Sequence, residues 1–272
     1  MLKIENTEVV GWEAAVRGMR NPMNSWKKSD SRFGCGNDNE YFCDNCSSSF
    51  HCTSLKKTYN IGPNDLDLMT RLRNAGTDHR KFMRMITVYL DITAPLYWWK
   101  EFDTYKVGTV ANSCSTMHKI ADKEFTLEDF SCEHLMSFNN SNYWEEDSDN
   151  ACFIDPSKKE VIVPMSLISN YIIPMLNIAR EKYNEMRQMT TEINLTETER
   201  NYAVTQQKLF WWQMIQLLPS SYNQKRTVML NYEVLANIYK SRRNHKLDEW
   251  HTFCDWIESL PYSGLITGNK EE

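Results

Sequence analysis

The feature that most constrains the fold is an alternating run, residues 85–93, that ends at Pro95. Apolar side chains occupy its even positions, from Ile86 to Ile92, and more polar side chains occupy most of its odd positions. Because successive side chains of a strand point to opposite faces, this pattern predicts a strand with one buried side. Proline closes the strand, and the aromatic-rich residues 96–104 predict a helix directly after it.

Helical patterns surround this strand in the sequence. Apolar residues spaced by three or four predict a helix from Asn64, its expected N-cap, to Gly76, where glycine ends it. Two long helices are expected at residues 165–190 and 197–218. Arg20, at the end of a shorter helical segment, is expected either on the surface or in an anion site.

Composition sets the broad class of the protein. With 272 residues, 41% of them hydrophobic and 25% charged, the chain is typical of one large globular domain with an insertion. Its net charge of -5 gives no general support for a nucleic-acid-binding surface, so no stable nucleic-acid binding is expected. No run approaches the length of a membrane span, and the N-terminus lacks the pattern of a signal peptide. We therefore expect a cytoplasmic protein whose eight cysteines are thiols or metal ligands.

Residues 29–59 form a segment of different composition, rich in Ser, Asn, Asp and Gly, that interrupts a main domain of residues 1–28 and 60–272. A CxxC pair in this segment lets two thiolates bind one metal from a tight turn. A third cysteine and either a fourth or the adjacent His51 complete the four ligands of a structural zinc site. The alternative is a flexible loop with free thiols. The predicted metal ligands are Cys35, Cys43, Cys46 and Cys52.

Near the C-terminus, residues 227–241 contain no Gly or Pro and have apolar residues at helical spacing, which predicts a helix with one buried side. Asn231 and Arg242 lie on one line along such a helix. His245 continues the spacing if the helix runs on, whereas Asn244 is an N-cap if a new helix begins there. On spacing alone, these side chains form either a solvated polar face or a site for a carbonyl or phosphate group.

The order of these motifs resembles the flavin-dependent thymidylate synthases, the ThyX family. The resemblance covers roughly residues 60–258 and is strongest from Leu218 to Trp250. The matching segments, in order, are Gly76-Thr-Asp-His79, the strand ending Ala94-Pro95, an aromatic helix, Lys106-x-x-Thr109-x-x-Asn112-x-x-Ser115, two helices, Leu218-Pro219, Thr227-x-x-x-Asn231, Arg242, His245 and Glu249-Trp250.

The resemblance implies roles for individual residues. Counted from Leu218-Pro219, Asn231 and Asn237 match flavin-binding amides, and Arg242 matches the arginine that contacts the pyrimidine of dUMP and stabilises charge during catalysis. His245 matches a flavin-contacting histidine after a one-residue deletion. The remaining implied residues are His79 and Thr109 for the cofactor, and Lys106, Asn112 and Ser115 for the substrate.

The chain also departs from the family pattern. The signature Arg-His-Arg becomes Thr104, Tyr105 and Lys106, and Glu233 stands where the family has an arginine. Fewer arginines hold a phosphate less tightly. The basic residues that are candidates to restore this charge are Arg80, Lys81, Arg84, Lys106 and Arg226.

The fold implied by the resemblance is α+β, an antiparallel sheet flanked by long helices, with the Cys-rich segment as an insertion. The implied reaction is reductive methylation of dUMP to dTMP with FAD as cofactor and methylene-tetrahydrofolate and NADPH as further partners, in a homotetramer with shared sites. Two alternatives stay open: a related flavin enzyme that modifies a pyrimidine nucleotide differently, for instance by hydroxymethylation, and a non-catalytic binding protein on the same fold.

Overall fold

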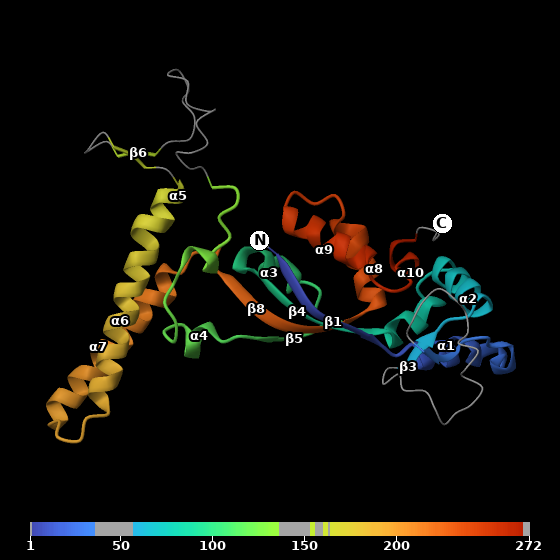
Figure 1. Ribbon diagram of the computed structural model, residues 1–272, viewed down its shortest axis with the longest axis horizontal. Coiled ribbons are helices and arrows are strands. Elements are labelled where there is room, and N and C mark those ends of the chain that lie inside the picture. The colour runs from blue at the N-terminus through green and yellow to red at the C-terminus, as the bar shows by residue number, and fades with distance from the viewer. Residues whose placement is uncertain (1, 36–56, 136–152, 156–159, 163, 269–272) are drawn as a thin grey trace, which may run out of the picture. The chain divides into compact units, whose positions relative to one another are not determined.

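The computed structural model describes residues 2–35, 57–135, 153–155, 160–162 and 164–268 (Figure 1). The chain forms two compact units. The sheet-containing unit comprises Ile4–Ile92, Asp103–Asn112 and Thr227–Glu272. The second unit comprises Met1–Lys3, Thr93–Phe102 and Ser113–Arg226. Within the described ranges, no helix is long and apolar enough to cross a membrane.

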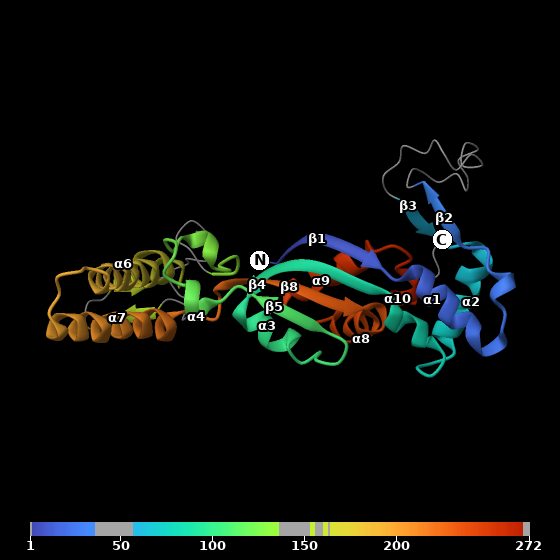
Figure 2. The ribbon, with the colours of Figure 1, turned by 90° about the horizontal axis from the view of Figure 1, so that it is seen from below.

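A four-stranded sheet has the strand order β1-β4-β8-β5, as Figure 2 shows. Tyr232 N–H donates to the carbonyl of Ile86, and the Thr227 hydroxyl donates to Asp91. From the first contact to the second, the residue number in β8 falls while that in β4 rises, so the two strands are antiparallel. The strands are β1 (Lys3–Val10), β4 (Thr87–Pro95), β5 (Val110–Ser113) and β8 (Asn223–Asn231).

The predicted alternating strand is confirmed as β4. Its even-numbered apolar side chains are buried, and Ile86, just before the strand, is also buried. The strand starts at Thr87 because residues 80–85 form a short 3-10 helix, η4 (Arg80–Met85), before it. The aromatic helix is confirmed as α3 (Leu96–Phe102).

The predicted helix over residues 227–241 is wrong in its first third. Those residues belong to β8, and the helix α8 begins at Tyr232 and ends at Arg242. In β8, the buried Val228 and Leu230 alternate with more exposed neighbours, which is the two-residue period of a strand. Asn231 marks the change, because its side chain accepts the Val234 N–H at 3.1 Å and caps the helix.

Two helices of the sheet-containing unit, α2 and α9, begin at other residues than the sequence suggests. Helix α2 has Gly62 as its N-cap rather than Asn64, and the carboxylate of Asp30 accepts the first free N–H groups of the helix. Helix α9 has Leu247 as its N-cap, so the prediction that Asn244 caps it is wrong. The helices are α1 (Trp12–Arg20), η1 (Asn21–Met23), η2 (Trp26–Lys28), α2 (Pro63–Asn74), α9 (Asp248–Glu258) and α10 (Gly264–Thr267).

A buried ion pair joins α1 to α2. The guanidinium of Arg20 contacts the carboxylate of Asp65 at 2.6 Å, and the two side chains are 5% and 0% exposed. The second carboxylate oxygen of Asp65 accepts the hydroxyls of Ser29 and Ser31, each at 2.6 Å. Arg20 is therefore neither a surface residue nor part of an anion site, because an internal carboxylate holds it.

Two paired strands lie near the two ends of the Cys-rich segment. β2 (Arg32–Cys35) and β3 (Lys57–Asn60) pair antiparallel, with Arg32 opposite Asn60 and Cys35 opposite Lys57. The chain thus leaves and re-enters this unit through one two-stranded ribbon. Of the predicted metal ligands, Cys43, Cys46 and Cys52 lie outside the described residues, as does His51, so the zinc site stays a prediction.

The second unit is built around two long helices. Helices α6 and α7 lie side by side (Figure 1), as the sequence predicts, although a π-helical segment, Ile168–Ile172, interrupts the first. Thr196 and Glu199 form a reciprocal capping box that starts α7. Leu176 and Met214 are fully buried in one hydrophobic cluster with Phe125 and Phe130. The elements are α4 (Thr116–Lys119), η5 (Leu127–Asp129), β6 (Phe153–Asp155), β7 (Glu160–Ile162), α5 (Pro164–Leu167), α6 (Ile173–Thr190) and α7 (Glu197–Leu217).

Candidate functional site

Arg242, the last residue of α8, is held by two aromatic residues. Its Nε donates to the hydroxyl of Tyr105 at 2.9 Å, and its guanidinium lies 4.8 Å from the ring centre of Trp250. The Tyr105 and Trp250 rings meet edge to face at 6.2 Å, and Trp250 is fully buried. A guanidinium over a buried indole gains a cation–π attraction of about 1–2 kcal/mol. The charge of Arg242 is therefore held in one place.

His245 lies in the turn after α8 and contacts the same tryptophan. Its ring is 6.3 Å from Trp250, edge to face, and its Nδ1 accepts the Leu247 N–H at 3.2 Å. Since Nδ1 is the acceptor, the neutral ring carries its proton on Nε2, which is a hydrogen-bond donor. The structure thus brings two predicted site residues, Arg242 and His245, to one place.

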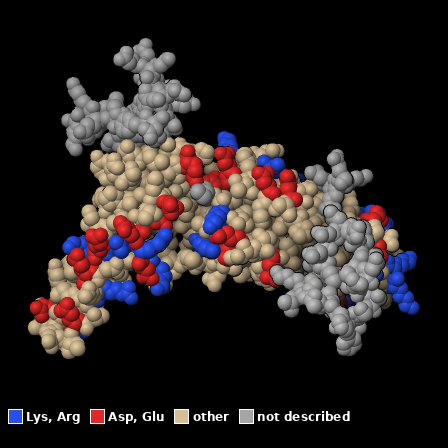
Figure 3. Space-filling view, in the orientation of Figure 1, with Lys and Arg blue, Asp and Glu red and all other residues tan. Residues whose placement is uncertain are grey.

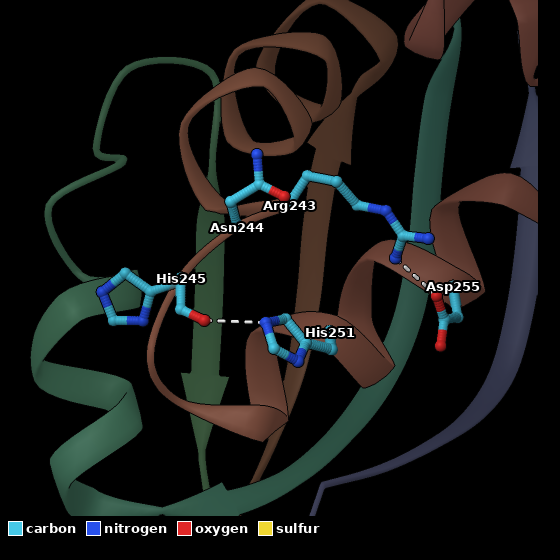
Figure 4. A pocket seen from close by; sticks show the side chains of 5 residues that line it. All are labelled: Arg243, Asn244, His245, His251 and Asp255. Carbon is cyan, nitrogen blue, oxygen red and sulfur yellow. Dashed lines mark hydrogen bonds and ion pairs between the residues drawn. The ribbon is translucent and has the colours of Figure 1, made fainter.

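An open hollow of about 570 Å³ lies beside this turn (Figure 4). Within it, Arg243 contacts Asp255 at 2.6 Å, and the same guanidinium lies 3.3 Å from Glu258. His251 donates to the backbone carbonyl of His245 at 2.7 Å. Two carboxylates balance Arg243, so its charge serves the fold rather than a ligand. The lining residues are Arg243, Asn244, His245, His251 and Asp255.

The loop after α3 runs along α8 towards Asn231. Tyr105 contacts Arg242 at the C-terminal end of the helix, whereas Gly108 lies against Asn231 at its N-terminal end. The helix has 11 residues, so these ends are about 16 Å apart. The hydroxyl oxygen of Thr109 is buried and has no hydrogen-bond partner among the described residues. A buried hydroxyl without a partner is costly, which makes it a candidate for contact with a ligand.

Gly108→Ala is expected to disturb this loop. Gly108 has a φ of +77°, and an added Cβ would lie 2.9 Å from Nδ2 of Asn231. We expect a loss of about 1–2 kcal/mol in stability from the left-handed backbone and, in addition, weaker FAD binding as Asn231 moves. Gly76→Ala is the matched control, since Gly76 has a φ of +109° and nothing within 4 Å of the added Cβ. Equal FAD affinity in the two variants, measured by titration, would contradict a cofactor role for this loop.

The opposite side of α8 carries a second group of predicted residues. Asn237 is five residues from Arg242, which places it about 140° around the helix. Its amide oxygen accepts from Arg80 at 3.4 Å, and His79 directly precedes η4 and is exposed. Within this unit, the structure therefore does not bring Asn237 and His79 together with Arg242.

Glu233 organises the charge on that side. Its buried carboxylate pairs with Arg80 at 3.3 Å and with Arg84. Burial favours the neutral carboxyl, but the hydrogen bonds and charge of Arg84 and Arg80 outweigh it and hold the pKa of Glu233 below its ordinary value. Arg80 and Arg84 were candidates to restore the phosphate-binding charge. Glu233, which in the resemblance stands in place of an arginine, partly neutralises both.

The predicted substrate-binding residues are divided between the units. Lys106 and Asn112 are exposed and lie in the sheet-containing unit. Ser115 lies in the other unit, where its hydroxyl accepts the His118 N–H at 3.1 Å and caps α4. Arg226 belongs to that unit as well and stacks its guanidinium 4.1 Å from the ring centre of a buried tryptophan, Trp99.

No family model and no curated protein sequence matches the chain. Among solved structures, the flavin-dependent thymidylate synthase ThyX of Helicobacter pylori, complexed with FAD and dUMP, matches with a TM-score of 0.51 and 15% identity over 99% of this chain and 100% of that one. The chain has a ThyX-like fold. A second Helicobacter pylori ThyX structure with FAD and dUMP gives 0.49 and 12% over 98% of both chains. The UMP/dUMP methylase PolB of Streptomyces cacaoi, bound with 5-Br dUMP, gives 0.46 and 12% over 95% and 89%.

The ThyX-like fold confirms the predicted antiparallel sheet with long helices, while the Cys-rich segment as an insertion stays a prediction. It spans both chains almost completely, so the likeness does not depend on one shared segment. Sequence reasoning missed two residues of the site, Tyr105 and Trp250, as partners of Arg242. The only signal in the sequence for Tyr105 was its place in the altered signature. Trp250 was recognised as part of a motif, but its ring contact with the Arg242 guanidinium was not predicted.

Proposed function

We propose that this protein is a flavin-dependent enzyme that methylates dUMP to dTMP, with methylene-tetrahydrofolate as carbon donor and NADPH as reductant. The observation that carries the proposal is the fixed guanidinium of Arg242, held by Tyr105 and Trp250 on a ThyX-like fold. It occupies the position where the resemblance implies a contact to the pyrimidine. A planar cationic fork of N–H donors suits the carbonyl oxygens of uracil, which accept hydrogen bonds.

Residues at both ends of α8 fit a flavin: His245 follows Arg242 at one end, and Asn231 and Thr109 lie about 16 Å away at the other. A flavin ring presents several hydrogen-bond acceptors along one edge, and this chain offers the amide of Asn231, the ring of His245 and the buried hydroxyl of Thr109. The side-chain oxygen of Asn231 is engaged in capping α8, so its NH₂ group is the part left to face a ligand. These three residues are the ones we propose to hold FAD.

Each residue has a defined part in the reaction. Reduced FAD held by these residues would supply the hydride that completes the methyl group. Arg242 orients the pyrimidine and stabilises negative charge that develops on its oxygen or nitrogen, because the guanidinium is already fixed before the substrate arrives. Trp250 beneath it excludes water from one side of the charge, which strengthens the interaction. No cysteine nucleophile is required; the thiols of Cys132 and Cys254 are buried, whereas that of Cys114 is exposed.

A related reaction, such as hydroxymethylation of a pyrimidine nucleotide, is the second candidate. The observation that favours it is Glu233, which engages Arg80 and Arg84 where the family has a further arginine. A carboxylate among these arginines changes how the site holds phosphate or a negatively charged co-substrate. Mass analysis of the product distinguishes a methyl from a hydroxymethyl group.

The homotetramer implied by the resemblance remains part of the proposal. Exposed apolar side chains recur at spacings of three or four along α5, the π-helical segment Ile168–Ile172 and α6, and Figure 3 shows an uncharged surface over the start of these helices. Such a stripe is more apolar than a monomer surface usually is, so we propose that a second copy of the chain covers it. A monomeric mass in solution would refute this assembly. The stripe consists of Leu167, Tyr171, Met175 and Ile178.

The test is product formation by the purified protein. With FAD, NADPH, methylene-tetrahydrofolate and dUMP present, we expect dTMP to accumulate, and we expect none when any one of the four is omitted. A hydroxymethylated product would favour the second candidate. Flavin binding without any product from dUMP or UMP would favour the non-catalytic alternative.

A further inference from the structure

Tyr105 stands at a position of the family signature where this chain has a different residue. In the resemblance it replaces a histidine, and it lies in the loop between α3 and β5. Its hydroxyl accepts the Nε–H of Arg242 at 2.9 Å, and its ring contacts Trp250 edge to face. Tyr105 is half-buried, so solvent competes only in part for this hydrogen bond.

The geometry fixes the plane of the guanidinium from two directions. Trp250 defines the face on which the group lies, and the hydroxyl of Tyr105 fixes Nε within that plane. A guanidinium is rigid and planar, so these two restraints together set the direction in which both Nη atoms point. An arginine held in this way loses little rotational freedom when a substrate binds.

We propose that Tyr105 is a positioning residue that aims Arg242 at the pyrimidine. This inference rests on the proposed function, and it adds a residue through which the chain compensates for its altered signature. The alternative is a purely structural role, in which the Tyr105 ring only packs against Trp250. That alternative requires the ring alone, whereas positioning requires the hydroxyl.

Tyr105→Phe separates the two roles, because phenylalanine keeps the ring and removes the hydroxyl. For FAD-loaded protein, we expect dUMP affinity, read from the change in flavin absorbance, to fall by up to about tenfold, since dUMP must then order the guanidinium that Tyr105 holds in wild type. The kcat/KM for dUMP is expected to fall similarly, and the melting temperature to stay unchanged. Tyr89→Phe is the matched control, because Tyr89 is an exposed tyrosine on β4 away from the site. Equal dUMP affinity in wild type and Tyr105→Phe would overturn the proposal.

A second readout needs no ligand. In protein labelled with ¹⁵N-arginine, the Nε–H signal of Arg242, assigned by its loss in Arg242→Lys, is expected to exchange slowly with water in wild type and faster in Tyr105→Phe. An unchanged exchange rate would show that Tyr105 does not restrain Arg242. Failure of wild type to bind FAD or dUMP would instead refute the proposed function, and the exchange rate would still decide whether Tyr105 holds the arginine.

Discussion

Replacing Arg242 with methionine is expected to remove most of the activity while leaving the fold intact. Methionine keeps an apolar chain over Trp250 and loses the charge and all five donors. Loss of a charged hydrogen-bonding partner costs about 1.5–3 kcal/mol, so dUMP affinity should fall by about 10- to 150-fold. Turnover should fall further, by about 10²- to 10³-fold, because the charge on the pyrimidine grows in the transition state. Steady-state kinetics and a dUMP titration measure the two effects.

Arg243→Met is the control for this prediction. Arg243 is the next residue along the chain, but its guanidinium pairs with Asp255 and Glu258 rather than with Trp250. Its removal should leave both dUMP affinity and kcat within about twofold, as is usual for a surface pair. Equal losses in the two variants would show that general positive charge at this end of α8, and not the held guanidinium of Arg242, supports binding.

Asp65→Asn is expected to have the largest effect on stability. Asparagine keeps the size of the side chain but leaves the buried charge of Arg20 without its counterion. Breaking a buried pair from one side costs about 3–5 kcal/mol, a large part of the stability of a domain. The free energy of unfolding from urea denaturation at pH 7 measures this loss. Asp67→Asn, two residues along on α2, removes an exposed pair with Arg71 and should cost less than about 1 kcal/mol.

The effect of Asp65 should depend on pH in a defined direction. Burial favours its neutral form, but hydrogen bonds from Ser29, Ser31 and Arg20 outweigh this and hold the pKa of Asp65 below its ordinary value. The stabilisation is therefore fully present above the unfolded pKa of about 3.9 and is lost as the pH falls through the lower folded value. The unfolding free energies of wild type and Asp65→Asn should converge in acid. A constant difference down to pH 2 would contradict a role for ionised Asp65.

The sequence was informative where a residue's neighbours in the chain decide its structure. The alternation through β4 and the paired long helices follow directly from periods of two and 3.6, and the structure has them. The start of α8 was harder to place, because Val228 and Leu230 fit a helical spacing and a strand equally well over so short a run. Only the pairing of β8 with β4, which lies far away in the sequence, decides in favour of a strand.

The site was predictable in its residues but not in its contacts. Arg242 and Asn231 are recognisable by spacing from Leu218-Pro219, yet their distances from Tyr105 and Gly108 depend on a loop more than a hundred residues earlier. The role of Glu233 was hidden for the same reason, since Arg80 and Arg84 come from another element. Ion pairs between distant segments leave no local pattern in one sequence.

The most direct test of the central claim is the absorbance of the purified protein with FAD, before and after dUMP is added. In wild type, we expect the absorbance band of a protein-bound flavin at about 450 nm, and we expect this band to shift when dUMP is added. In Arg242→Met we expect the same band, but its shift should need about 10- to 150-fold more dUMP than in wild type. A protein that binds no FAD, or a flavin band that dUMP leaves unchanged in wild type, would contradict the account.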